Sequence, residues 1–533
     1  MFSKFHTIKN NTSFHILILI CLSFFTCLKA KWAYEAFTES NIPVYDGVMY
    51  QYHQIKRYES FQGDFSWINH YSQAVYEFQG HYVTAAYNSF ITFFCPSLLK
   101  NDLDIFIRGI LTLLIFSFSA YVYFREKIGK LKTVVIIGII LQMPFFTHYR
   151  TGINTYIPEL SCALLIISGY LLILHFFSTF QFKHFAVGLI LMISTIGIRF
   201  NFFSYVFLLG LPLLFIYIKN WNNYSSKLKK LTLIYTIIIL IFTGSYILYF
   251  YTPFYTYYTK TAYAYSTISL SFSTMLQDFW TYFSWEGYII LALIILVKKT
   301  IAIENSWKYN FLILYPFLIF FIFIILILKT ENIPHIISVM AFFFSMSAFL
   351  ISPINKLKIN SKFTSILVIF LLGLINYSFL KSIDKNKNIE QYQVQNTLIS
   401  FFTHKIQSNK AETPNYLCFF EGMTEIPINV AIYQKTNKLI TNKEFFFNQD
   451  VFYKNGLNCQ NSSECFAYYK KNIGDIDYII INSKPPIINL FPIARKLNIK
   501  MLTYLKTCSE FKVIKKIKST YYGEIIIYQR IKK

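Results

Sequence analysis

Three charged residues that adjoin short turns between apolar runs have types that could do chemistry together: Asp46, Glu159 and Arg199. Each also has an ordinary structural explanation. An Asp-Gly pair commonly forms a turn, a carboxylate at the start of a helix is stabilised by the helix dipole, and an arginine at the end of a span can extend its charge to the membrane surface. Gathered in one pocket, two carboxylates and a cation would suit a phosphate-bearing substrate. The segments around them decide whether they can meet.

Composition places these residues in a membrane protein. The chain has 533 residues, of which 55% are hydrophobic and only 14% are charged, whereas soluble domains average about 25% charged residues. A water-soluble protein cannot cover so much apolar surface with so few polar side chains. The formal charge of +24 does not indicate nucleic acid as a partner, because no basic segment carries a nucleic-acid-binding motif and most basic clusters flank apolar runs.

Apolar runs long enough, or nearly so, to cross about 30 Å of hydrocarbon predict about eleven transmembrane helices, with ten to thirteen as the range. They cover residues 14–29, 105–124, 133–147, 157–176, 184–198, 202–218, 231–250, 287–298, 309–328, 335–352 and 363–380. The first run also has the features of a cleaved signal peptide, with Ala30 near its end. We favour an uncleaved anchor.

Basic residues gather in alternate loops, which predicts the orientation of the chain. The opposite short loops hold only Arg150, Arg199, Lys260 and Lys329. The positive-inside rule then places the N-terminus in the cytoplasm and the C-terminal domain outside the cytoplasmic (inner) membrane. We expect a transmembrane domain over residues 1–380, including an outer loop at 30–104, and an extracytoplasmic domain over 381–533.

The C-terminal domain has the pattern of a small α/β fold. Strands are expected at 416–420, 429–433, 478–482, 511–517 and 524–529, and helices at 389–407, 462–472 and 489–505. The domain carries 23 Lys and Arg against 12 Asp and Glu, which is either a solvated surface or an attraction to anionic head groups. Cys459 and Cys465 are close enough in sequence to close a small disulfide loop in an oxidising compartment.

This combination of spans, loops and charges resembles the polytopic glycosyltransferases of the GT-C superfamily, which use lipid-linked sugars. It is most similar to the bacterial branch related to protein O-mannosyltransferases and aminoarabinose transferases. In these, a long outer loop with an early aspartate follows the first span, and a second acidic residue stands near the start of the fourth span. A basic residue follows in a later turn. The chain departs from the pattern at Gly47, where mannosyltransferases have a second acidic residue, and at Gly80-His81-Tyr82, where a His-Pro-Pro-like segment is expected.

The resemblance implies a transferase that moves a hexose or pentose from a polyprenyl-phosphate carrier to an acceptor in the cell envelope, such as lipopolysaccharide, another glycan or a protein. Asp46 would accept the proton of the acceptor hydroxyl as it attacks the anomeric carbon with inversion. Glu159 would orient the acceptor or help to hold a divalent cation, whose presence stays open. The remaining assignments are donor-phosphate binding by Arg199, Arg150 and Lys260 and substrate contact by Tyr50, His53 and His81.

Three other functions remain open. An oligosaccharide ligase or polymerase would act on lipid-diphosphate-linked glycans, but such enzymes tend to carry their large outer loop late in the chain. A transporter or flippase usually shows internal repeats and charges within the membrane, and the spans appear nearly free of charge in the sequence. A membrane scaffold whose outer domain binds a partner fits the same segments.

Overall fold

The computed structural model describes the main helical and strand regions of the chain: residues 12–38, 102–148, 152–155, 159–198, 202–253, 370–381, 389–408, 416–419, 425–438, 462–483, 492–519 and 523–531, with the single or paired residues 51–52, 55, 72, 255, 287, 289, 315, 414 and 440. The chain divides into two compact units. The membrane unit is built mainly from residues 1–35 and 102–383, and the C-terminal unit mainly from residues 384–533.

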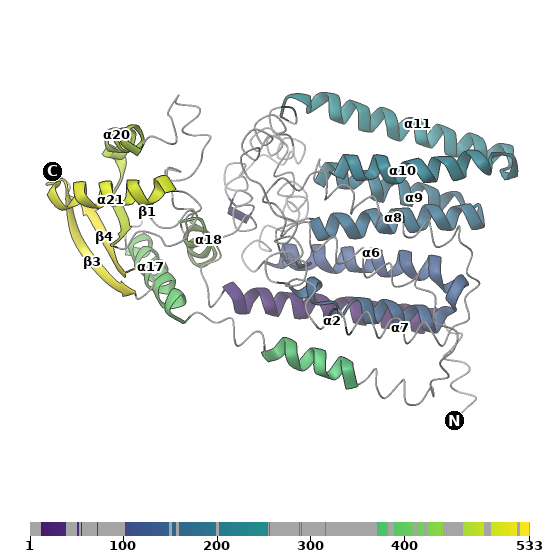
Figure 1. The fold of residues 1–533 in the computed structure, drawn as a ribbon, viewed down its shortest axis with the longest axis horizontal. Coiled ribbons are helices and arrows are strands. Elements are labelled where there is room, and N and C mark those ends of the chain that lie inside the picture. The colour runs from purple at the N-terminus through teal and green to yellow at the C-terminus, as the bar shows by residue number, and fades with distance from the viewer. Residues whose placement is uncertain are drawn as a thin grey trace. The chain divides into compact units, whose positions relative to one another are not determined.

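The membrane unit is a bundle of apolar helices that run alongside one another (Figure 1). Four of the described helices have a segment long and apolar enough to cross a membrane: Thr12–Ala36, Leu103–Ile128, Glu159–Thr179 and Ser226–Tyr249. The helices are α2 (Thr12–Thr38), α6 (Leu103–Ile128), α7 (Lys130–Ile140), α8 (Glu159–Thr179), α9 (Phe182–Ile198), α10 (Phe202–Lys219) and α11 (Ser226–Tyr249), with a further apolar helix at Phe370–Lys381. This is the architecture expected of a multi-pass membrane protein.

The number of spans stays a prediction, because the runs at 309–328 and 335–352 lie almost wholly outside the described residues. The run predicted at 133–147 is interrupted in the structure. Helix α7 ends at Ile140, and a short 3-10 helix, η2 (Pro144–Thr147), begins at a proline. With 11 residues, α7 is shorter than the roughly 20 residues that a span needs.

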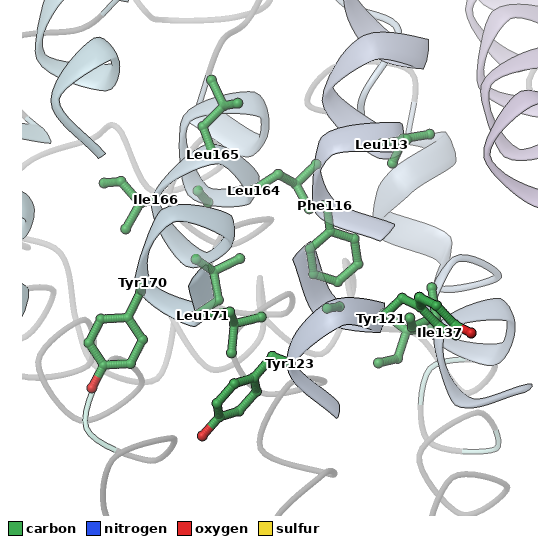
Figure 2. Close-up of a cluster of buried hydrophobic side chains, with 14 of the residues drawn as sticks. Leu113, Phe116, Tyr121, Tyr123, Ile137, Leu164, Leu165, Ile166, Tyr170 and Leu171 are labelled. Atoms are coloured by element: carbon green, nitrogen blue, oxygen red, sulfur yellow. The ribbon is translucent and has the colours of Figure 1, made fainter. Parts of the chain in front are cut away.

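Helix α8 lies at the centre of the described bundle and is buried along nearly its whole length. Its contact with α6 is filled by apolar side chains, among them Leu164 of α8 and Phe116 of α6 (Figure 2). Its contact with α9 is closer, because a glycine on each helix faces the other. A Cβ atom added to Gly188 would lie 2.7 Å from the carbonyl oxygen of Gly169. Small residues allow two backbones to approach in this way.

Helix α2 is joined to its neighbours by polar contacts near its C-terminal half. The Cys27 thiol donates to the carbonyl oxygen of Phe106 on α6 at 3.4 Å. The Lys29 ammonium donates to Asn376 Oδ1 at 2.8 Å and to Gln142 Oε1 at 3.3 Å. The later part of α2, the start of α6 and the end of α7 therefore lie at the same end of the bundle.

The C-terminal unit is a four-stranded sheet with helices on both faces. Its strands are β1 (Tyr416–Phe419), β2 (Tyr478–Asn482), β3 (Phe511–Ser519) and β4 (Gly523–Arg530), in the order β1-β2-β4-β3. Strand β1 is parallel to β2, and β4 is antiparallel to both β2 and β3. Helices α17 (Ile389–Ser408) and α18 (Glu425–Thr436) contribute to the core on one face, and α20 (Ser462–Asn472) and α21 (Pro492–Thr507) to the core on the other.

Four of the five predicted strands and all three predicted helices of this unit are confirmed, which makes it the expected small α/β domain. The strand predicted at 429–433 is wrong, because these residues belong to α18. Ile428 and Ile432 are one helical turn apart and both are fully buried. Pro427 stands in the first turn of α18, where the missing N–H costs no helical hydrogen bond.

Candidate functional site

Of the residues predicted to do chemistry in the membrane unit, the structure describes Glu159. It is the first residue of α8, and only 4% of its surface is exposed. The others lie outside the described residues: Asp46, Tyr50, His53, His81, Arg150, Arg199 and Lys260. Their meeting with Glu159 in one pocket stays a prediction.

A tight turn precedes α8 in the chain. The amide N–H of Gly152 donates to the carbonyl oxygen of His148 at 2.7 Å, and that of Ile153 donates to the carbonyl oxygen of Phe146 at 2.9 Å. The Thr155 hydroxyl closes the turn by donating to the carbonyl oxygen of Gly152 at 2.9 Å. A Cβ atom on Gly152 would lie 2.7 Å from the carbonyl oxygen of Phe146, so only glycine fits there.

Helix α6 contacts this turn through Arg108. The Arg108 side chain is fully buried, and its Nη2 donates to the carbonyl oxygen of Thr155. The neighbouring Gly109 lets the turn approach the helix, because a Cβ atom there would lie 3.4 Å from the carbonyl oxygen of Ile153 and 2.9 Å from Cys27 Sγ. Three segments, α2, α6 and the turn before α8, therefore meet around Arg108.

Several charged or polar groups are buried at this end of the bundle. Asp104 stands one turn before Arg108 on α6 and is also fully buried. Asn154 and Ser161 flank the start of α8 and are almost completely buried. Withdrawing ions from water is costly, so charged residues inside a membrane bundle commonly mark functional sites. We refer to Asp104, Arg108, Asn154, Thr155 and Glu159 as the polar cluster.

Asp104 and Arg108 were not predicted from the sequence, because residues 105–124 have the pattern of one apolar run and the predicted site residues all came from the loops and span ends. A signal was available: an Asp and an Arg spaced i, i+4 lie on one face of a helix, at the end where a span meets the loops. Within the described residues, no group of three or more His, Cys, Asp or Glu side chains could hold a metal ion. The polar cluster itself contains two carboxylates, Asp104 and Glu159, and the guanidinium of Arg108.

The predicted disulfide lies in the C-terminal unit and stays a prediction, since Cys459 is outside the described residues. Cys465 is buried within α20, in the core beneath α21. Directly after α21, the Cys508 thiol lies 3.4 Å from the hydroxyl oxygen of Tyr504, which belongs to that helix. The side-chain interaction with Cys508, together with burial, raises the pKa of Tyr504 to about 12.

Comparison with known proteins gives a slight structural likeness. No protein-family model matches the chain, and no curated protein matches it. Among solved structures, it is similar to the Archaeoglobus fulgidus oligosaccharyltransferase, determined with a tethered acceptor peptide that contains the NVT sequon. The identity is 13% and the TM-score 0.42, over 89% of this chain and 69% of that one. A likeness of this size assigns neither a fold nor a function.

Proposed function

We propose that this protein is a membrane glycosyltransferase that moves a sugar from a polyprenyl-phosphate carrier to an acceptor outside the cytoplasmic membrane. The observation that carries the proposal is the buried carboxylate of Glu159 at the start of α8, together with the buried guanidinium of Arg108, which binds the turn at Thr155. A carboxylate and a cation at the end of a helical bundle suit a substrate with its tail in the bilayer and its phosphate near the surface. The sequence resemblance to GT-C glycosyltransferases supports the same function.

In the proposed reaction, the acceptor hydroxyl attacks the anomeric carbon of the donor sugar. The carboxylate of Asp46 takes the hydroxyl proton, and the bond between the anomeric carbon and the phosphate oxygen breaks with inversion. Polyprenyl phosphate leaves, with its charge neutralised by Arg199, Arg150 and Lys260. Glu159 orients the acceptor. The proposed topology puts the N-terminus in the cytoplasm and the C-terminal domain outside.

The proposal is tested first in cells with and without the gene. Mass spectrometry of surface glycolipids, glycans and glycoproteins is expected to show one sugar missing when the gene is absent, and restored by the wild-type gene. Asp46→Asn is expected to leave it missing while the protein inserts in normal amounts. An unchanged profile would favour a transporter or a scaffold. An intact sugar monomer that fails to be joined into longer glycans would favour a ligase or polymerase.

The purified full chain in liposomes gives the direct test. Polyprenyl-phosphate mannose and polyprenyl-phosphate aminoarabinose are the probes, with extracted envelope glycolipid and envelope protein as acceptors. Transfer of the sugar, with release of polyprenyl phosphate, is expected for one donor. Movement of the donor across the bilayer without transfer would identify a flippase and overturn the proposal.

A further inference from the structure

Arg108 was not a predicted site residue, yet its charged side chain is fully buried and its Nη2 donates to a backbone carbonyl oxygen. The bond from Nη2 to the carbonyl oxygen of Thr155 joins α6 to the turn four residues before Glu159. Thr155 in turn bonds to Gly152. The guanidinium therefore contacts the last described part of the turn before α8 begins.

We propose that Arg108 is a positioning residue: it fixes the turn before α8 and so holds the carboxylate of Glu159 in its place for sugar transfer. This inference rests on the proposed function. It assigns Arg108 no contact with the substrate. Its effect on the reaction passes through Thr155 and the first turn of α8.

The chemistry of the guanidinium suits this role. It presents its donors in a rigid plane and stays protonated even when buried, whereas a lysine is a flexible point charge whose proton is lost more easily on burial. A carbonyl oxygen that accepts from a charged donor is held more firmly than one that accepts from a neutral amide. Gly109 lets the turn approach α6, and Gly152 lets the turn itself close tightly on His148 and Phe146. The contact is therefore close, directional and buried.

A matched control lies one turn further along α6. The Thr112 hydroxyl donates to the carbonyl oxygen of Arg108 at 2.8 Å, and Thr112 is as deeply buried as Arg108. This hydrogen bond lies within its own helix, so Thr112→Val changes a buried polar residue of α6 while leaving the bond from Arg108 to Thr155 in place. Arg108→Gln removes the charge, and Arg108→Lys keeps the charge but loses the planar geometry.

The first experiment measures the turn itself and needs no substrate. Asn154 is almost completely buried in the turn, so the full chain carrying Asn154→Cys is treated with a maleimide in detergent and the labelled peptide is quantified by mass spectrometry. Arg108→Gln is expected to speed labelling at position 154 by about 10-fold, the ratio that follows from weakening the closed turn by about 1.4 kcal/mol. Thr112→Val is expected to leave the rate unchanged.

Native Cys162 reports whether α8 as a whole has loosened, because it is fully buried three residues after Glu159. Its labelling is expected to stay slow in Arg108→Gln. The inference would be overturned if position 154 were labelled at the same rate with Arg108 present and in Arg108→Gln. Fast labelling at both positions would also overturn it, because Arg108 would then support the fold and not the turn.

The second experiment measures transfer from the polyprenyl-phosphate sugar on which the wild type is active. A displaced catalytic group commonly costs about 100-fold in rate, so Arg108→Gln is expected to lower kcat by about that factor with little change in KM for the donor. Arg108→Lys is expected to recover only part of the loss. If Arg108 affects the reaction only by positioning Glu159, adding Arg108→Gln to Glu159→Gln lowers kcat no further.

Two results would overturn the inference in a protein whose wild type transfers sugar. In one, the losses of kcat in Arg108→Gln and Glu159→Gln multiply in the double variant. In the other, Arg108→Gln has a normal kcat. Failure of the proposed function gives a different result, in which the wild type transfers no sugar at all. The labelling experiment then still decides whether Arg108 fixes the turn.

Discussion

The two units of the molecule bury different kinds of polar side chain. In the described part of the membrane unit, the buried polar side chains include four that carry a formal charge: Lys29, Asp104, Arg108 and Glu159. In the described part of the C-terminal unit, the buried polar side chains are all amides: Gln51, Gln395, Asn429, Asn482 and Asn498. The C-terminal unit has plenty of charges, but strand β3 carries its lysines on partly or fully exposed positions.

This difference indicates which unit keeps buried charges despite the free energy that burying them costs. A domain in water can place each ion on its surface, and buried amides such as Asn498, which donates to Asn482 Oδ1 at 2.6 Å, need only a partner. An ion inside a bundle in a bilayer is costly to bury, and such ions commonly mark functional sites. The buried charges of the membrane unit lie near the end where α6 and α8 begin, so we expect that end to be functional.

The largest expected effect concerns how tightly the membrane unit is packed. Gly169→Ala adds a Cβ atom that would lie 2.7 Å from Met192 Cγ and closer still to the carbonyl oxygen of Gly188, both on α9. Because the helices must separate, the variant is expected to lose about 3 kcal/mol of unfolding free energy, at the high end for overpacking. Thermal unfolding of the full chain in detergent measures this loss.

Gly210→Ala on α10 is the matched control, because nothing lies within 4 Å of a Cβ atom added there. It is expected to stabilise the protein by up to about 1 kcal/mol, through better helix propensity. Equal effects of the two alanines would mean that α8 and α9 do not depend on their glycines.

An intermediate effect is expected at Lys29, which is 8% exposed and donates to Asn376 and Gln142. Lys29→Met leaves two amide oxygens without their donor and is expected to cost about 1–3 kcal/mol. Lys31→Met is its control, because Lys31 is partly exposed and pairs with Glu35 one turn away at 3.0 Å, worth about 0.2–0.5 kcal/mol. A higher melting temperature in Lys29→Met would show that burying the ammonium costs more free energy than its two hydrogen bonds contribute.

The smallest effect is expected for an exposed charge of the C-terminal unit. Lys516 pairs with Glu524 at 3.1 Å across the β3–β4 hairpin, with both side chains partly or largely exposed. Lys516→Gln is expected to cost less than about 1 kcal/mol, and the cost should vanish at high salt. Hydrogen exchange of β3 and β4 in the full chain measures it. A cost as large as that of Lys29→Met would remove the contrast between the units.

Much of the fold could be predicted from the sequence. Long apolar runs predicted the described spans, and β2 was placed at its observed residues because Tyr478–Asn482 is a short buried run between turn residues. Asn429–Tyr433 was misassigned because four of its five residues are apolar, and such a short apolar run fits a strand as well as a helix. The observed helix depends on Pro427 at its start and on the core under Ile428 and Ile432.

Less of the candidate site could be predicted. Glu159 was found because a lone carboxylate beside a proline and an apolar run is visible in the sequence. The role of Arg108 depends on a carbonyl group 47 positions away, and no local pattern reports which backbone atom a side chain will meet. The approach of the turn to Gly109 has the same origin, since it depends on how α6 and the turn pack.

The central claim is that the membrane unit buries charge at the start of α8 because transfer requires it, and one pair of variants tests this most directly. Glu159→Gln keeps the shape of the side chain and removes its charge. Glu510→Gln does the same in the C-terminal unit, where Glu510 is half exposed and pairs with Arg530 at 3.1 Å.

Sugar transfer from the polyprenyl-phosphate donor is measured for equal amounts of folded, membrane-inserted protein. Glu159→Gln is expected to fall by about 100-fold, and Glu510→Gln is expected to match the wild type. Full transfer by Glu159→Gln would contradict the account.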